Sequence, residues 1–217
     1  MTTRRTVLAF GLSGLLMLAA ASPMAAAAEP DGRSLLKAFL QRSALQGEFV
    51  QVNQDRDGRI TAETSGRFSF LRPGGFEWIT TKPYRQTIVS NGERLWLYDE
   101  DLNEVTVAAA ADMLGQTPAA LLLGGDYSLE DAWTLAPAPD VDGHAAVDAS
   151  PKEESSFARI RFIFDRRTGE PVQMAVTDAF ANRMLISFRA LSDEPKPASA
   201  YDFVVPKGAE VVENLPR

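Results

Sequence analysis

Apolar and polar residues alternate in short runs along most of the chain after Gly47. In residues 66–71, for example, Phe68 and Phe70 fall on one side of an extended chain. A period of two predicts β-strands with one dry face and one wet face. The runs that predict strands are 48–53, 66–71, 76–80, 86–90, 94–98, 104–107, 127–135, 159–165, 172–176, 184–188 and 203–205.

Turn-forming pairs separate several of these runs. Asp57-Gly58 and Asn91-Gly92 are strong signals for β-hairpins, and Thr168-Gly169 is a further turn signal. We interpret residues 137–142, 150–156 and 192–200 as polar loops. About ten short strands joined in this way indicate a mainly β, antiparallel fold in a single domain.

Three short helices are expected beside the strands. The first covers residues 33–44, with Asp31 as its N-cap and an apolar face of Leu35, Leu36, Phe39 and Leu40. The second covers 108–114. The third covers 117–123 and lies between Thr117-Pro118 and Gly124-Gly125. Their apolar faces need cover, so we expect them to lie across the dry face of a strongly curved sheet.

The first 28 residues have the pattern of a cleaved secretory signal peptide. Arg4 and Arg5 precede an apolar stretch at 7–21, and alanines at 25–28 follow it. Residues 29–217 then form the mature domain, and we expect it to be exported to the periplasm as a soluble protein. The arginine pair leaves general secretion and twin-arginine export both open.

Charge excludes several classes of partner. The chain carries a net charge of −7, and residues 1–28 hold two of its 22 basic groups and none of its 29 acidic ones, which leaves −9 for residues 29–217. A protein this acidic is repelled by phosphate backbones and by anionic lipid. We therefore expect no nucleic-acid binding and no stable membrane insertion.

Catalytic chemistry has few candidates. The chain has no cysteine and one histidine, so no thiolate, no disulfide and no ordinary zinc site is available. His144 lies near Asp142 and Asp148, but no serine elbow accompanies it. We expect no catalytic residue, no metal and no cofactor.

Several motifs, taken in order, resemble the LolA family of periplasmic lipoprotein carriers over nearly all of the mature chain. The matching segments are Arg72-Pro73 with Phe76-Glu77-Trp78, Lys82-Pro83-Tyr84, Ser90-Asn91-Gly92 with Leu95-Trp96-Leu97-Tyr98, and Thr117-Pro118 with Leu121-Leu122-Leu123. The resemblance implies an unclosed antiparallel β-barrel (a half-barrel) of about 10–11 strands, with a lid of short α-helices over an apolar concave face.

The resemblance also implies a function and partners. A carrier of this family binds acyl chains of lipoproteins released by an inner-membrane ABC-type exporter, and delivers them to an outer-membrane acceptor. We expect such a carrier to work as a monomer. Arg72 matches the arginine that latches the lid in the family, and Phe76 and Trp78 match aromatic residues of the cavity.

Other apolar residues on the strands and helices are candidates for the same cavity. An aromatic side chain on one strand face is ordinarily packed core, so the hypothesis is that some of these residues line a cavity. The full candidate set is Leu36, Leu40, Phe68, Phe70, Phe76, Trp78, Trp96, Leu121, Leu122, Phe162, Phe164 and Phe188.

Two other functions remain open on the sequence. One is a periplasmic carrier or sensor of another lipid or amphiphile on the same fold. The other is an enzyme that acts on lipids, for which the chain offers no catalytic constellation.

Overall fold

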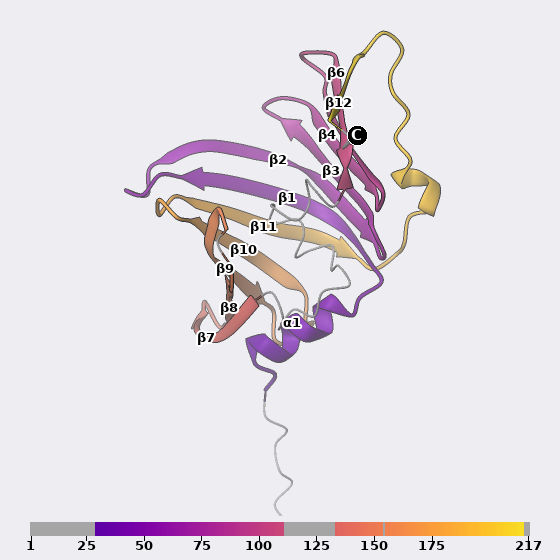
Figure 1. The fold of residues 1–217 in the computed structure, drawn as a ribbon. Helices are drawn as coiled ribbons and strands as arrows, with labels where there is room; N and C mark the ends of the chain where they lie inside the picture. The colour runs from indigo at the N-terminus through magenta and orange to yellow at the C-terminus, as the bar shows by residue number, and fades with distance from the viewer. Residues whose placement is uncertain (1–28, 111–132, 154, 215–217) are drawn as a thin grey trace, which may run out of the picture.

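One twelve-stranded sheet forms most of the molecule (Figure 1). The structure is a computed structural model, and it describes residues 29–110, 133–153 and 155–214. The strands are β1 (Ala44–Gln54), β2 (Ile60–Leu71), β3 (Gly75–Lys82), β4 (Gln86–Asn91), β5 (Arg94–Asp99), β6 (Glu104–Ala109), β7 (Trp133–Val141), β8 (His144–Pro151), β9 (Phe157–Phe164), β10 (Pro171–Asp178), β11 (Arg183–Ser192) and β12 (Glu210–Asn214).

The sheet is curved and does not close. Its strand order is β12-β6-β5-β4-β3-β2-β1-β11-β10-β9-β8-β7, so β12 and β7 are the outermost of the described strands. Sequence neighbours pair as antiparallel hairpins, β1 pairs with the distant β11, and β12 pairs with β6 in parallel. The expected unclosed, antiparallel half-barrel is thus confirmed, with one parallel pair at its edge.

The helix α1 (Gly32–Leu40) lies inside the curve of the sheet, against β7, β8 and β9 (Figure 1). Its N-cap is Asp31, as expected, and the Asp31 carboxylate accepts a hydrogen bond of 2.8 Å from the Ser34 amide. Gly32 permits the close approach of α1 to β8, because a Cβ atom at this position would lie 2.3 Å from the Ala146 carbonyl oxygen.

One face of the sheet carries the core, and we call it the concave face. The ladders place Leu45 beside Phe70 and Phe70 beside Phe76, so alternate residues of successive strands point to the same side. On the other half of the sheet, Met174 pairs with Ile186 and with Phe162, so these three side chains also share one face. These side chains belong to one buried cluster, which α1 joins through Leu35, Leu36 and Phe39.

The opposite, convex face is partly covered by residues 193–209, which we call the strap. The strap leaves β11, forms the 3₁₀ helix η1 (Ala198–Tyr201), and leads into β12 (Figure 1). Tyr201 is 2% exposed, and its hydroxyl lies 3.4 Å from the Ser69 hydroxyl. Lys196 forms an ion pair with Glu77, so the strap is fixed to β3 by charge as well as by apolar contact.

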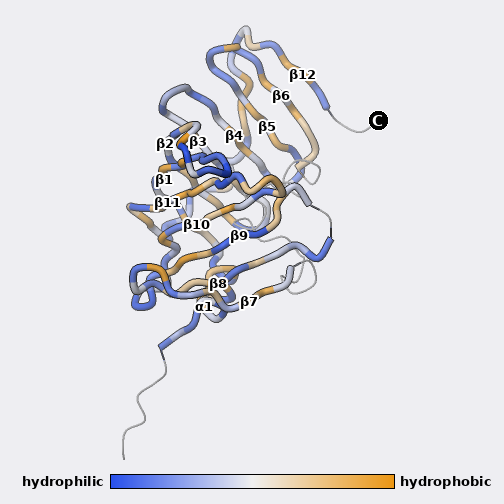
Figure 2. Tube along the Cα trace, turned by 90° about the vertical axis from the view of Figure 1, so that its left-hand side faces the viewer, coloured by the Kyte–Doolittle hydropathy of each residue, from blue (hydrophilic) through white to orange (hydrophobic). Residues whose placement is uncertain are grey.

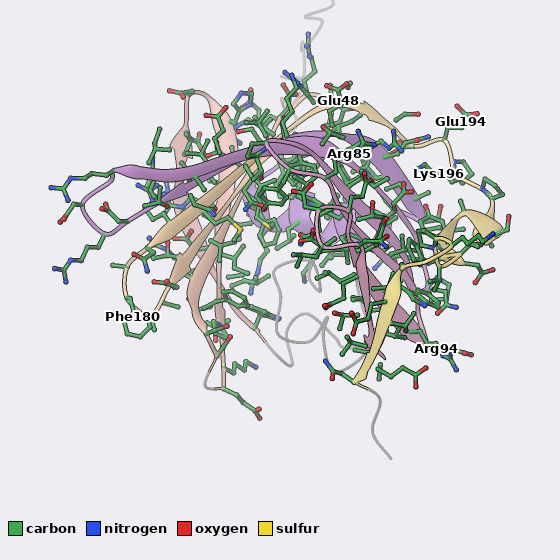
Figure 3. The ribbon with its side chains drawn as sticks, turned by 90° about the horizontal axis from the view of Figure 1, so that it is seen from above. Glu48, Arg85, Arg94, Phe180, Glu194 and Lys196 are labelled. Carbon is green, nitrogen blue, oxygen red and sulfur yellow. The ribbon has the colours of Figure 1, made fainter. Side chains whose placement is uncertain are left out.

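Polar residues mark the turns and the outer surface. Figure 2 shows hydrophilic residues at many turns and hydrophobic residues within the strands. Figure 3 shows Glu48, Glu194 and Lys196 on the outer side of the curved sheet. The ion pair between Arg189 and Glu48, at 2.9 Å, joins β11 to β1 on this side.

The structure corrects several expected elements. The first helix ends at Leu40, and the chain enters β1 at Ala44. Residues 137–141, expected as a loop, belong to β7, and β8 is a strand that the sequence pattern does not predict. Residues 203–205 form no strand, because the strap carries them across the convex face.

Most of the two helices expected at 108–114 and 117–123 falls outside the described residues. Ala108 and Ala109, expected to begin the second helix, are the last residues of β6. Ala110 is described and is buried, whereas residues 111–114 of that helix and the whole of the helix expected at 117–123 lie outside the described residues. So does the expected signal peptide at 1–28.

Candidate functional site

The middle of the concave face is a group of four aromatic rings from four strands. Phe49 of β1 stacks on Trp78 of β3, with 3.8 Å between ring centroids and 24° between planes. Phe68 of β2 lies 5.9 Å from Trp78 and 5.3 Å from Phe188 of β11. The alternation of β2 and β3 brings Phe68 and Trp78 opposite each other, so the strand register builds this apolar surface directly.

A backbone position without a side chain makes room for the stacked pair. Gly66 lies opposite Phe49 in the ladder between β1 and β2. A Cβ atom at Gly66 would come within 1.8 Å of the Ile79 carbonyl oxygen and 3.0 Å of the Phe49 ring. Glycine is therefore required here by close packing between β2 and β3.

A second aromatic group joins α1 to both halves of the sheet. Phe39 of α1 makes an edge contact with Phe70, at 6.1 Å between centroids, and a tilted contact with Phe164, at 5.9 Å. Phe39 and Phe164 are almost completely buried. Because β2 and β9 lie far apart in the strand order, Phe39 connects two regions of the concave face through a single helix.

Arg72 lies at the border of this second group, just after the last residue of β2. Its guanidinium carbon is 4.3 Å from the centroid of the Phe70 ring and 5.7 Å from that of Phe39. Its guanidinium also donates a hydrogen bond to the Arg42 carbonyl, and its amide donates one of 2.7 Å to the Ser43 carbonyl. Arg72 thus holds the connection between α1 and β1 against the end of β2.

That connection has further contacts. The Arg42 side chain lies 3.0 Å from an Asp193 carboxylate oxygen and donates to the Gly169 carbonyl at 3.4 Å. The short segment after α1 is therefore tied to β2, to the turn between β9 and β10, and to the start of the strap.

Burial makes the charge of Arg72 costly. Removal from water lowers the pKa of the Arg72 guanidinium to about 10. The group stays protonated at neutral pH, so its charge must be stabilised by carbonyl oxygens and aromatic faces.

Most of the candidate cavity residues lie together. Leu36 and Leu40 come from α1, and Leu36 is buried while Leu40 is half-buried. The strand residues on the concave face are Phe68, Phe70, Phe76, Trp78, Phe162, Phe164 and Phe188. Leu121 and Leu122 lie outside the described residues.

Trp96 is the exception, because it points to the convex face. It alternates with Leu95 and Leu97 in β5, and Leu95 lies beside Ser90, which pairs with Phe76 on the concave face. Trp96 instead stacks on Phe203 of the strap, with 6.3 Å between centroids. Both faces of β5 are apolar because each is covered, and the sequence alone does not distinguish them.

Two residues that belong to the site are absent from the candidate set. Phe49 is fully buried and stacks on Trp78, and Phe39 links Phe70 to Phe164. The available signal for Phe39 is its place on the apolar face predicted for the first helix. Phe49 is harder to find because Gln51 and Asn53 follow it on the same side of β1.

The parts of the chain that the structure describes contain few polar side chains grouped as in a metal site or a catalytic site. Within them, no three histidine or acidic side chains are grouped so as to hold a metal ion. His144 lies at the start of β8, with its Nδ1 atom 4.0 Å from an Asp165 carboxylate oxygen. None of the helices in the described ranges is long and apolar enough to span a bilayer.

Comparisons with known proteins agree with this geometry. The family model described as outer membrane lipoprotein carrier protein LolA matches residues 41–203. The outer-membrane lipoprotein carrier protein of Leptothrix cholodnii is 39% identical over 215 residues, which cover 98% of this chain and 99% of that protein. The carrier protein of Methylobacillus flagellatus is 40% identical over 185 residues, 84% of this chain and 89% of its own.

A solved structure has a similar fold at low sequence identity. An uncharacterised conserved protein from Thermus thermophilus aligns with a TM-score of 0.56 at 12% identity, over 84% of this chain and 98% of its own. The half-barrel is thus found in a protein of very different sequence. The family match over most of the chain and the carrier relatives lead to one conclusion: the chain belongs to the LolA family of outer-membrane lipoprotein carrier proteins.

Proposed function

We propose that this protein carries lipoproteins through the periplasm, with their acyl chains held against the concave face of the half-barrel. It receives them from an inner-membrane ABC-type exporter and delivers them to an outer-membrane acceptor. The observation that carries the proposal is the continuous apolar concave face, which runs from Phe76 through Phe68 and Phe188 to Phe162.

The physical need for such a carrier follows from the cost of moving acyl chains through water. Each methylene group removed from water is worth ~0.8 kcal/mol, so a chain of about 16 carbons resists transfer by ~12 kcal/mol. A soluble carrier must cover such a chain, and must also cover its own apolar surface when it is empty. The buried state of Phe68, Phe76 and Phe162 fits the covered, empty form.

Arg72 is the proposed latch of this covered form. Hydrogen bonds from a charged donor are worth about 1.5–3 kcal/mol each. Free energies of this size favour closure, yet they are smaller than the free energy gained by burying an acyl chain. The contacts of Arg72 with Phe39 and with the carbonyl of Arg42 supply such a latch at the end of α1.

The relatives support the class of cargo. They are named outer-membrane lipoprotein carrier proteins, and they match this chain over nearly their full length. Within the proposal, the concave face supplies the binding surface and the acidic surface keeps the carrier in solution.

Native mass spectrometry of the protein purified from a periplasm containing lipoproteins tests this function. We expect bound species with the mass of triacylated polypeptides, and their loss when the purified carrier is mixed with membranes that contain the acceptor. A free glycolipid as the bound species would instead favour a carrier of another amphiphile. A protein that carries no acylated species under any loading condition would contradict the proposal.

A further inference from the structure

The strand β12 leaves one side of the sheet open for pairing. It is the last strand in the order, and β6 is its neighbour among the described strands. All five of its residues, Glu210–Asn214, are exposed, including Val211 at 45% and Val212 at 36%. Figure 2 shows β12 at the outer limit of the molecule, beyond β6.

The hydrogen-bond pattern identifies the backbone groups that face outward. The Glu210 amide donates to the Asn103 carbonyl at 2.9 Å, on the side of β6. In a parallel ladder, alternate residues turn both their N–H and their C=O groups to the same neighbour. Val212 and Asn214 therefore face β6 as well, and Val211 and Glu213 present their backbone groups to the open side.

The two outermost described strands differ in how well they are protected against the addition of a further strand. The edge strand β7 contains Pro137 and Pro139, which have no N–H group to offer to an added strand. The edge strand β12 has the sequence Glu-Val-Val-Glu-Asn and contains no proline. An exposed edge with β-branched residues and unpaired backbone groups is suited to strand addition.

Charge selects the kind of strand that fits. Glu210 lies beside Glu104 in the ladder, and Glu104 lies beside Asp99. Like charges placed directly opposite one another are destabilising, and Glu213 adds a further carboxylate on β12. A basic segment beside β12 would relieve this repulsion, and Lys207 is the nearest basic residue before β12 in the sequence.

We propose that the open edge of β12 binds an extended, positively charged segment of a partner protein as an added β-strand. The backbone of Val211 and Glu213 supplies the hydrogen bonds. The carboxylates of Glu210 and Glu213, which lie on opposite faces of the strand, select lysine or arginine on each face. This site is separate from the concave face, so the proposal does not depend on the nature of the carried lipid.

A second copy of this chain is a poorer occupant. Pairing of two β12 strands would bring together Glu210 and Glu213 from both copies. The repulsion among these carboxylates would add to that between two molecules of net charge −7. The edge thus favours a basic partner over self-association.

A short synthetic peptide of repeated Lys-Lys-Val-Val units, labelled with a fluorophore, serves as the probe, because its extended form carries lysine on both faces. Its binding to the protein is measured by fluorescence anisotropy at physiological salt. Val211→Pro removes an outward N–H group while leaving the pairing with β6, and edge strands tolerate proline in this orientation. Val211→Thr is the matched control, since it keeps the N–H group and the β-branched shape.

We expect the peptide to bind the wild type and Val211→Thr with similar affinity, and to bind Val211→Pro about tenfold more weakly or worse. Amide exchange at Val211 and Glu213 should slow on binding, while the Val212 amide, already paired, should change little. A peptide with glutamate in place of lysine should not bind.

Three outcomes would overturn the proposal. They are equal binding to Val211→Pro and to the wild type, absence of peptide binding to the wild type, and a dimer whose formation Val211→Pro abolishes. Circular dichroism of each variant checks that the sheet remains folded, and slow exchange of the Val212 amide checks that β12 stays paired with β6, so a loss of binding reports on the edge.

Discussion

Arg72 combines a high cost of burial with several contacts that offset it. Its pKa is lowered to about 10 by burial, which means that the folded state disfavours its charge. Because the folded-state pKa of Arg72 lies below the unfolded value, the charged arginine destabilises the fold at neutral pH. This free-energy cost falls only as the pH rises toward and above 10, where the folded protein loses the proton. The resemblance to a family motif identified this residue, while its contacts with Phe39, Phe70 and Arg42 required the structure.

We therefore predict that Arg72→Leu leaves the protein folded but impairs the release of cargo. Leucine removes the cost of burying the Arg72 charge, and this offsets the loss of the hydrogen bond to the Arg42 carbonyl. Loss of the latch weakens closure, so bound lipoprotein should be retained when acceptor is added. Transfer of lipoprotein to the acceptor in vitro is the measurement.

The control is Arg67→Leu, which changes an exposed arginine of β2. It should release cargo at the rate of the wild type. If Arg72→Leu also releases cargo normally, Arg72 has no part in the mechanism.

Gly66 is a second residue at which the structure makes a sharp prediction. A Cβ atom there would overlap the Ile79 carbonyl oxygen at 1.8 Å. Gly66→Ala should lower the free energy of unfolding by about 1–3 kcal/mol or more, since the overlap is with backbone that must move. Urea unfolding measures this loss, with Glu63→Ala, an exposed position of β2, as the control. Equal stability of the two variants would contradict the tight packing of β2 on β3.

At the scale of elements, α1 is the described part of the helical cover. The N-cap residue of α1, Asp31, predicts how the stability of this helix changes at low pH. Hydrogen bonds from Ser34 lower the pKa of the Asp31 carboxyl from 3.8. A lowered folded-state pKa gives stability that is present above pH 3.8 and is lost as pH falls through the folded pKa.

The helix should therefore loosen at acid pH in a way that depends on Asp31. Asp31→Asn retains an N-cap but cannot titrate, so amide exchange in α1 should depend less on pH below about 4 than in the wild type. Hydrogen exchange resolved to α1 is the measurement. An identical pH dependence in both proteins would show that other groups control the helix.

A further prediction concerns how closely α1 approaches β8. Gly32→Ala places a methyl group where a Cβ atom would be 2.3 Å from the Ala146 carbonyl oxygen, so the start of α1 must move outward. Amide exchange in α1 should become faster than in Arg33→Ala, which changes the exposed neighbouring residue. Unchanged exchange in Gly32→Ala would show that α1 adapts without loosening.

Elements with large alternating side chains were predictable from the sequence, and others were not. The β9 pattern of Ile160, Phe162 and Phe164 predicted its strand correctly. The strand β8 was missed because its inward residues, Ala145, Val147 and Ala149, are small and give weak alternation. Prolines led to the interpretation of residues 137–141 of β7 as a loop, although an edge strand accepts them.

Residues 203–205 show a different limit of prediction from sequence. Phe203 and Val205 alternate as a strand would, yet the strap packs Phe203 on Trp96 and Tyr98 instead. Whether an apolar residue faces one side of a sheet or the other depends on what covers each side. That information comes from contacts between distant segments, so the assignment of Trp96 to the cavity was wrong for the same reason.

At the scale of the whole molecule, the sheet separates two apolar surfaces. The concave face carries the aromatic groups around Trp78 and Phe39, and the convex face carries a smaller group around Tyr201 and Trp96. The strap fixes the second group with the ion pair of Lys196 and Glu77. We assign cargo binding to the first surface alone.

Tryptophan fluorescence provides the most direct test of that assignment. The chain has three tryptophans, and Trp78 and Trp96 lie on opposite faces. Variants that retain only one of them, with phenylalanine at the other two positions, can be titrated with a triacylated lipopeptide whose chains carry bromine, a contact quencher. We predict strong quenching of Trp78 and little quenching of Trp96. Equal quenching of both, or quenching of Trp96 alone, would contradict the claim that acyl chains bind on the concave face.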